Sequence, residues 1–275
     1  MMQILLPAEF QEEHRQIVLA YLNHGHTFNR QAWQRAVVAF DLLNNAALFS
    51  STGFSPFPVI YRQQVEHRYA DAFIAQLYQV DRVEHASMAL WAEVAGKIAV
   101  DLAEAGLYSE KLPMTRYLLA YCLYWWRSFT AGYALEIEIQ QDLTKTGIEF
   151  TAHDLRHREE RLSPYDLLIT GFKGDVKTST YFLQATRSRT LAHDFYITRI
   201  RSSRSTRTLV VFIQAGMWQE IDGDTLLVLL EELAETLPDA AQIVHQGLAL
   251  TVIDYDLWKN KIRRYQAERR KRNKL

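Results

Sequence analysis

Three acidic residues and one lysine in the middle of the chain are of the types that bind a metal ion and activate water. Glu136 lies in a segment with helical periodicity, and Asp166 opens an apolar run. Asp175 and Lys177 lie in a β-branched stretch, where side chains alternate between faces, so the two are expected to project from the same face. Buried charges are costly unless they are paired or bind a metal ion. Oxygen ligands of this kind suit a hard divalent cation.

The chemistry that these residue types favour is hydrolysis of a phosphodiester. Two carboxylates alone would repel a phosphate, whereas a Mg²⁺ ion held between them binds a phosphate oxygen and lowers the pKa of a bound water. A lysine ammonium can orient that water or neutralise charge on the phosphate. Asp166, Asp175 and Lys177 therefore form the expected site, with Mg²⁺ as its cofactor and Mn²⁺ as a substitute.

The helix that is expected to end at Gly147 adds a third carboxylate. Its inward stripe, at steps of three or four residues, consists of Phe129, Gly132, Glu136, Ile139 and Leu143. Glu138 falls nearer the edge of this stripe. A carboxylate among residues that face a sheet needs a partner, so Glu136 rather than Glu138 is predicted to join the metal site.

The elements that must position these residues follow from a change of pattern along the chain. Apolar residues before residue 130 recur at helical spacing, with a loop expected over 50–58. After Gly147 the period changes to two, with a hairpin turn expected within 171–174 and a late helix over 224–237. The expected strands are 148–151, 165–170, 175–181, 195–200, 208–213 and 249–253.

The fold class that follows is α+β or α/β, with a helical N-terminal region and then a mixed β-sheet core flanked by helices. We expect three parts: a helical region over residues 1–112, a core over 113–257 and a basic tail over 258–275.

Positive charge is concentrated in the second half of the chain. The formal net charge is −1, but residues 1–150 carry −5 and residues 151–275 carry +4. Nucleic-acid-binding proteins gather positive charge in this way. The tail from Lys259 to Lys274 is either such a surface or a solvated charge run. The arginines predicted to contact a phosphate backbone are Arg187, Arg189, Arg199, Arg201, Arg204 and Arg207.

The composition argues against several other classes of protein. The single cysteine, Cys122, excludes an internal disulfide and a cysteine-based zinc cluster, and it is compatible with a reducing cytoplasm. No stretch approaches the roughly 18 consecutive apolar residues of a membrane helix. We therefore expect a cytoplasmic protein with no membrane partner. His153 and His157, just beyond the first predicted strand, are expected in a solvated loop.

The order of the charged residues resembles the PD-(D/E)xK nuclease superfamily. The resemblance rests on Gly132-x-x-x-Glu136, Gly147 before a strand, Pro164-Tyr165-Asp166 and Asp175-x-Lys177. The helix portion, GYALEIEIQQDLTKTGIEF, is most similar to the opening of Holliday-junction resolvases and related restriction-type endonucleases. Two departures stand out, since Tyr165 separates Pro164 from Asp166, and aspartate stands at position 175 where glutamate is commoner.

The resemblance implies a restriction-endonuclease-like fold and a metal-dependent nuclease, with DNA before RNA as its nucleic-acid partner. It assigns Glu136, Asp166 and Asp175 to the metal and Lys177 to catalysis. It adds Gln184 as a catalytic residue, because some exonuclease branches carry a glutamine on the next helix. The helical N-terminal region would bind substrate, a protein partner or a second copy of the chain.

Two alternatives stay open. One is a non-catalytic nucleic-acid-binding or assembly protein on a degenerate nuclease fold. The other is a protein–protein interaction module in which the helices are the functional part. Metal binding separates the enzyme from the first alternative, and salt-sensitive retention on DNA argues against the second.

Overall fold

The computed structural model of the chain describes residues 3–50, 53–178, 193–201, 206–213, 240–245 and 248–272. The chain divides into two compact units, Met1–Ala131 and Gly132–Leu275. The division falls within α6 (Thr115–Lys145), so the first half of this helix belongs to one unit and the second half to the other. The predicted α+β class is confirmed, since helices and sheets are both present. Of the helices in the described ranges, none is both long enough and apolar enough to cross a membrane.

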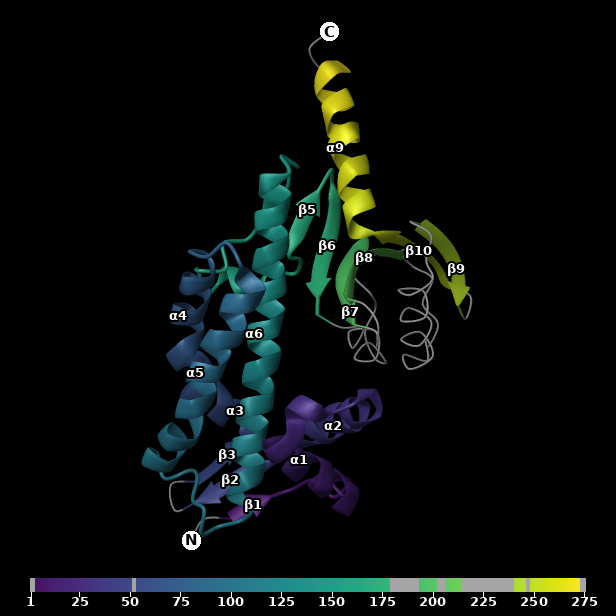
Figure 1. Cartoon of the computed structure of the whole chain (residues 1–275). Coiled ribbons are helices and arrows are strands. Elements are labelled where there is room, and N and C mark those ends of the chain that lie inside the picture. The colour runs from purple at the N-terminus through teal and green to yellow at the C-terminus, as the bar shows by residue number, and fades with distance from the viewer. Residues whose placement is uncertain are drawn as a thin grey trace. The chain divides into compact units, whose positions relative to one another are not determined.

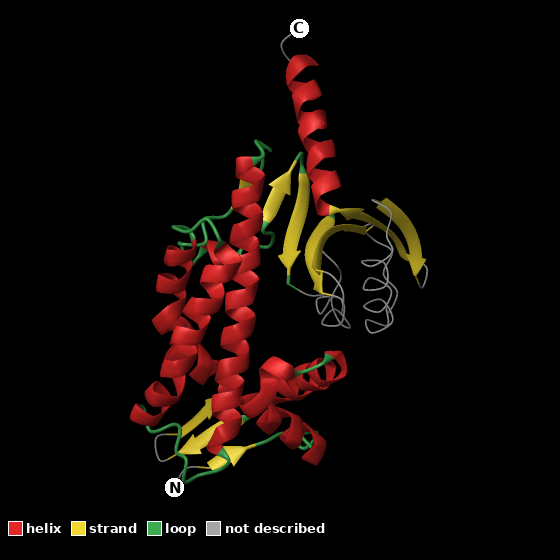
Figure 2. Cartoon of the chain, in the orientation of Figure 1, coloured by secondary structure: helices red, strands yellow, loops and turns green. Residues whose placement is uncertain are grey.

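The first unit combines helices with a small antiparallel sheet in the order β1-β2-β3 (Figure 2). Its elements before α6 are β1 (Gln3–Leu5), α1 (Glu12–His24), a 3-10 turn (Gly25–Thr27), α2 (Arg30–Leu43), β2 (Ala47–Ser50), β3 (Gly53–Pro56), α3 (Phe57–Tyr61), a π-helical turn (Arg62–Glu66), α4 (His67–Leu77) and α5 (Val83–Glu104). The sheet corrects the sequence prediction of helices with a loop over 50–58. None of its strands is longer than four residues, which is too short for a two-residue period to be recognised.

Aromatic side chains form the core of the first unit. Phe40 stacks on Tyr124 with the ring centroids 4.0 Å apart, and the Tyr121 hydroxyl donates a hydrogen bond to Asn44 Oδ1 at 2.7 Å. Trp126 is fully buried. Most of the aromatic run at the start of α6 therefore packs helices together, as the burial of Tyr121, Tyr124 and Trp126 shows.

The second unit is a mixed sheet with the second half of α6 and the helix α9 beside it (Figure 1). Within the described ranges its strands follow the order β4-β5-β6-β7-β8-β10-β9. Neighbouring strands are antiparallel except β6 and β7, which are parallel. The elements are β4 (Thr151–Ala152), a 3-10 turn (Glu160–Leu162), β5 (Leu167–Ile169), β6 (Phe172–Lys177), β7 (Phe195–Arg201), β8 (Thr206–Ile213), β9 (Ala240–His245), β10 (Leu248–Asp254) and α9 (Tyr255–Arg272).

The sequence analysis missed the strand β9, because its sequence lacks a clear alternation of apolar and polar residues. Its place is set by antiparallel pairing with β10. The helix predicted over 224–237 lies outside the described residues.

One apolar core holds α6 and α9 on the sheet. Its members include Leu135, Ile139 and Leu143 of α6, Val176 and Ile197 of the sheet, and Trp258 of α9. The three α6 residues recur at four-residue steps, so one side of the helix is fixed against the strands. Each such side chain contributes about 1.5–3 kcal/mol when it is buried. This packing fixes the rotation of α6 and hence the direction of Glu136.

A Schellman motif ends α6 and directs the chain into the sheet. Gly147 has a φ of 70°, a backbone conformation that favours glycine. Its N–H donates to the Thr144 carbonyl at 3.0 Å, and the N–H of Ile148 donates to the Leu143 carbonyl at 3.1 Å. Ile148 then packs in the same core as Leu143. The predicted stop at Gly147 therefore has a defined geometry.

A two-residue turn at Thr170–Gly171 joins β5 to β6. Both residues have positive φ, 53° and 92°, as in the primed turns that suit hairpins. The predicted turn within 171–174 was too long, because Gly174 already lies in β6, opposite Leu167. A Cβ at Gly174 would collide with the ring of Phe195 on the next strand. This glycine is therefore required for close packing and not for the turn.

The segment predicted as a basic tail is the helix α9, and part of it is packed. Trp258 is 3% exposed. The Gln266 side chain hydrogen-bonds the backbone of Glu149 in both directions, accepting from its N–H at 2.8 Å and donating to its carbonyl at 2.7 Å. The helix is thus attached to the second unit over several turns.

Candidate functional site

The β5–β6 hairpin brings two aspartates together. Asp166 stands one residue before β5, and its N–H donates to the Gly174 carbonyl at 3.0 Å. Its Oδ2 accepts a hydrogen bond from the Val176 N–H at 2.7 Å. Asp175 lies close enough to Asp166 to help raise the pKa of its carboxyl group. The two acids therefore project to one side of the hairpin, as a shared cation requires.

Lys177 lies on the same face of β6 as Asp175. Its Nζ lies 2.6 Å from Asp175 Oδ1 in a charge-assisted hydrogen bond. The Asp175 side chain is 11% exposed and that of Lys177 is 40% exposed. The Asp175 carboxylate is thus enclosed, while the Lys177 side chain is partly open to solvent.

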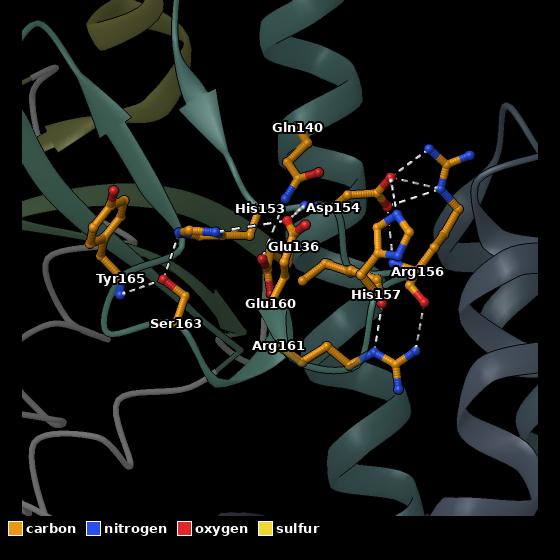
Figure 3. Close-up of polar contacts among 11 residues, drawn as sticks. Glu136, Gln140, His153, Asp154, Arg156, His157, Glu160, Arg161, Ser163 and Tyr165 are labelled. Atoms are coloured by element: carbon orange, nitrogen blue, oxygen red, sulfur yellow. Dashed lines mark hydrogen bonds and ion pairs between the residues drawn. The ribbon is translucent and has the colours of Figure 1, made fainter.

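The two glutamates of α6 have different partners. Glu136 is 7% exposed, and its carboxylate accepts a hydrogen bond from Gln140 at 3.3 Å (Figure 3). Glu138 instead forms a two-pronged ion pair with Arg199 of β7, at 2.5 and 3.1 Å. Glu136 is therefore the α6 carboxylate whose charge acts on the two aspartates.

Burial and mutual repulsion raise the pKa values of two of these acids. Loss of hydration raises the pKa of Glu136 to about 7, with a further contribution from the charge of Asp175 and an opposing one from Lys177. Loss of hydration also raises the pKa of Asp166 to about 9, helped by its hydrogen bond with Asp175 and by the charge of Glu136. With these pKa values Asp166, and in part Glu136, keep their protons near neutral pH, whereas a bound cation would favour the ionised carboxylates.

The type of donor suits Mg²⁺, although the part of the chain that the structure describes contains no preformed cage of three His, Cys, Asp or Glu side chains. Mg²⁺ usually keeps several waters and is held by one or two carboxylates together with substrate phosphates. Asp166 and Asp175 would therefore supply enough protein ligands. Thr198, the register partner of Lys177 on β7, adds a buried hydroxyl to which no described group is hydrogen-bonded. Both the donor set and this unpaired hydroxyl are compatible with a bound polar ligand.

The parallel pairing of β6 and β7 brings to the site a histidine that the sequence did not predict. The Nδ1 of His193 lies 3.6 Å from Asp175 Oδ2 and 3.3 Å from the Tyr196 hydroxyl. Its Nε2 lies 2.5 Å from the Pro164 carbonyl oxygen. No spacing rule links a residue before one strand with a residue inside another, so only knowledge of the strand pairing could have found it.

A polar loop between β4 and β5 has its own hydrogen-bond network (Figure 3). His153 Nε2 lies 2.5 Å from the Ser163 hydroxyl, and Glu160 accepts a hydrogen bond from the Asp154 N–H at 2.7 Å. Hydrogen bonds from Arg156 lower the pKa of Asp154 to about 2. These contacts join the two ends of the loop. The His153 side chain therefore stabilises the loop that leads to β5.

The predicted backbone-binding arginines have three different outcomes. Arg199 is paired with Glu138, and Arg207 is paired with Asp254 at 2.9 Å. These two side chains are 15% and 22% exposed, so they stabilise the sheet and are poorly placed for phosphate. Arg201 is the last residue of β7. The predicted residues that lie outside the described ranges are Arg187, Arg189, Arg204 and Gln184.

Comparison of the chain with protein-family models, with curated proteins and with solved structures finds no match.

Proposed function

We propose that this chain is a Mg²⁺-dependent nuclease, and in the first place an endonuclease that cuts DNA. The observation that carries the proposal is the Asp175–Lys177 pair on β6 beside Asp166 at the start of the hairpin, with the buried Glu136 of α6 close enough to influence the pKa of Asp166. Uncompensated buried carboxylates cost stability, and such clusters are characteristic of functional sites.

The order of elements supports a restriction-endonuclease-like core. After α6 come β4, the β5–β6 hairpin and then β7, which pairs with β6 in parallel. Glu136 stands on the helix, Asp166 stands before the first hairpin strand, and Asp175-x-Lys177 lies on the second. These are the positions of the motifs for which the sequence resembles the PD-(D/E)xK superfamily.

The surroundings of each residue allow a defined role. Asp166 and Asp175 would hold Mg²⁺, with the carboxylate of Glu136 nearby, and the ion would place positive charge beside the phosphate and lower the pKa of a water. The Val176 N–H keeps the Asp166 carboxylate pointing to the same side as Asp175. The Lys177 ammonium, on a side chain that is 40% exposed, would orient the attacking water or neutralise charge on the phosphate.

The helix α9 offers a better phosphate-backbone surface than the β-strand arginines. Its exposed basic residues include Lys261, Arg263, Arg264, Arg269, Lys271 and Arg272. Arg270 pairs with Glu149 at 2.7 Å, and Lys259 pairs with Asp142 at 2.6 Å. Positive charge that is exposed in this way binds a phosphate backbone without regard to sequence.

The direct test is incubation of the full chain with supercoiled, linear and branched DNA in Mg²⁺, Mn²⁺ or EDTA. We expect cleavage with either metal, none in EDTA and none by Asp175→Asn. Glu159→Gln removes one exposed negative charge from the same unit and should cut like the wild type. Retention on DNA without cleavage in any metal would favour the non-catalytic alternative, and neither binding nor cleavage would favour a protein-interaction module.

A further inference from the structure

We propose that His193 is a positioning residue that holds the two aspartates of the site in register. This inference rests on the proposed nuclease function, since the aspartates matter through the metal ion that they would bind. His193 connects three segments that are distant in sequence. It stands just before β7 and contacts Asp175 on β6. It also contacts the carbonyl of Pro164, in the loop that leads to Asp166.

The backbone beside His193 is fixed to the start of β6. The N–H of Asp194 donates to the Lys173 carbonyl at 2.9 Å, and the Asp194 carboxylate accepts from the Lys173 N–H at 2.8 Å. These two hydrogen bonds extend the parallel pairing of β6 and β7 by one residue beyond Gly174 and Phe195. The imidazole therefore projects from an anchored position, and its side chain is only 14% exposed.

The contacts of the ring define its tautomer. The Pro164 carbonyl can only accept a hydrogen bond, so the Nε2 at 2.5 Å from it must carry the proton and donate. The Nδ1 then accepts a hydrogen bond from the Tyr196 hydroxyl at 3.3 Å, while Asp175 Oδ2, at 3.6 Å, lies beyond hydrogen-bond distance. Because Nε2 is already hydrogen-bonded to a carbonyl, the ring is poorly placed to exchange a proton with substrate. Its contacts instead hold neighbouring segments of the chain in place.

The hydrogen bond from His193 to the Pro164 carbonyl would oppose the repulsion between the two aspartates. Asp166 and Asp175 repel each other when both are ionised, and the repulsion would tend to separate the loop at Pro164 from β6. The Nε2–H bond to the Pro164 carbonyl holds that loop two residues before Asp166. Groups behind the metal ligands that orient them in this way typically affect metal affinity by about 10–100-fold.

Three substitutions separate the donor from the bulk of the ring. His193→Ala removes both. His193→Gln can place an amide N–H near the position of Nε2, while His193→Asn can reach only the position of Nδ1. We expect Mn²⁺ affinity to fall by about 10–100-fold in His193→Ala and His193→Asn, and to recover by about tenfold in His193→Gln. At saturating metal, kcat should fall by less than the affinity does.

The measurement is Mn²⁺ binding by electron paramagnetic resonance on the full chain without nucleic acid, followed by metal titration of DNA cleavage. His157→Ala is the matched control, because its side chain is 60% exposed and it pairs within its own loop, with Asp154 at 3.7 Å. Thermal melting verifies that each variant is folded, and the Gln and Asn variants decide the question if His193→Ala unfolds.

The outcomes separate this inference from the proposed function. If the wild type binds Mn²⁺ and cuts DNA but the Ala and Asn variants bind Mn²⁺ equally well, His193 has no positioning role and the nuclease proposal stands. If Gln is no better than Asn, the hydrogen bond to Pro164 is not what matters, which also overturns the inference. If the wild type neither binds Mn²⁺ nor cuts DNA, the proposed function fails first and the role of His193 fails with it.

Discussion

Replacing Glu136 with glutamine should stabilise the metal-free protein at pH 8 while it impairs cleavage. Burial raises the pKa of Glu136 from 4.5 to about 7 in the folded protein. Between these two pH values the folded state holds a proton that the unfolded state has released, so stability falls as the pH rises through this window. Below pH 4.5 both states are protonated and the penalty vanishes. Above pH 7 the penalty is complete.

The size of the effect follows from the shift. Each pKa unit corresponds to about 1.4 kcal/mol, so a rise from 4.5 to about 7 costs about 3–4 kcal/mol at pH 8. At pH 5 the same relation leaves under about 1 kcal/mol. Glutamine has nearly the same shape and keeps the oxygen that accepts from Gln140. Glu136→Gln should therefore raise the melting temperature at pH 8 by about 2–4 °C for each kcal/mol recovered.

The assay is thermal unfolding in EDTA at pH 5 and pH 8, with Glu138→Gln as the matched control on the same helix. Glu138 pairs with Arg199 and is 35% exposed on its side chain, so its replacement should give no gain at pH 8. Added Mg²⁺ should narrow the difference, because a bound cation would offset the repulsion in the wild type. A Glu136→Gln variant that melts at the wild-type temperature at pH 8, or that gains equally at both pH values, would refute the reasoning.

Three further predictions concern neighbouring charges. Lys177→Ala should abolish cleavage and leave DNA affinity nearly unchanged, but it should also destabilise the metal-free protein by about 1–3 kcal/mol, because it removes the ammonium partner of the enclosed Asp175 carboxylate; normal cutting by this variant would remove the lysine from the mechanism. Arg199→Ala should destabilise the protein by about 1–3 kcal/mol in denaturant unfolding, because it leaves the Glu138 carboxylate unpaired. It should leave the salt dependence of DNA binding unchanged. A flatter salt dependence would show that Arg199 contacts the DNA backbone after all. Neutralising three exposed positions of α9 should reduce the magnitude of the salt slope by up to about 2.7, at about 0.9 for each phosphate that is no longer neutralised, and an unchanged slope would assign the helix face to solvent. The residues to change to glutamine are Lys261, Arg264 and Arg269.

The α9 experiment uses point substitutions because truncation cannot be interpreted. Removing the chain after Trp258 would delete Gln266, whose side chain makes two hydrogen bonds to the backbone of Glu149. A truncated protein could lose DNA binding simply because it unfolds. Exposed side chains on the same helix can be changed without that risk, since surface substitutions usually alter stability by less than about 0.5 kcal/mol.

The sequence alone determined those features that depend on local periodicity. Helical spacing in α6 selected Glu136 over Glu138 as the inward carboxylate, because the apolar stripe of a helix repeats every three or four residues. The two-residue period of a strand placed Asp175 and Lys177 on one face. The stop at Gly147 also followed from local chemistry, because a left-handed residue at the end of a helix favours glycine.

The tertiary structure alone decided which strands pair and which charges meet. A strand does not specify its neighbours, because the hydrogen bonds between strands join residues that are distant in sequence. The parallel pairing of β6 with β7 is such a non-local choice, and it brings His193 to Asp175 and Arg199 to Glu138. Gly174 had a clear sequence signal for a turn, yet its purpose is close packing against the Phe195 ring on β7. Local patterns therefore named the acids and the lysine, while the packing of β7 brought His193 to Asp175 and Arg199 to Glu138.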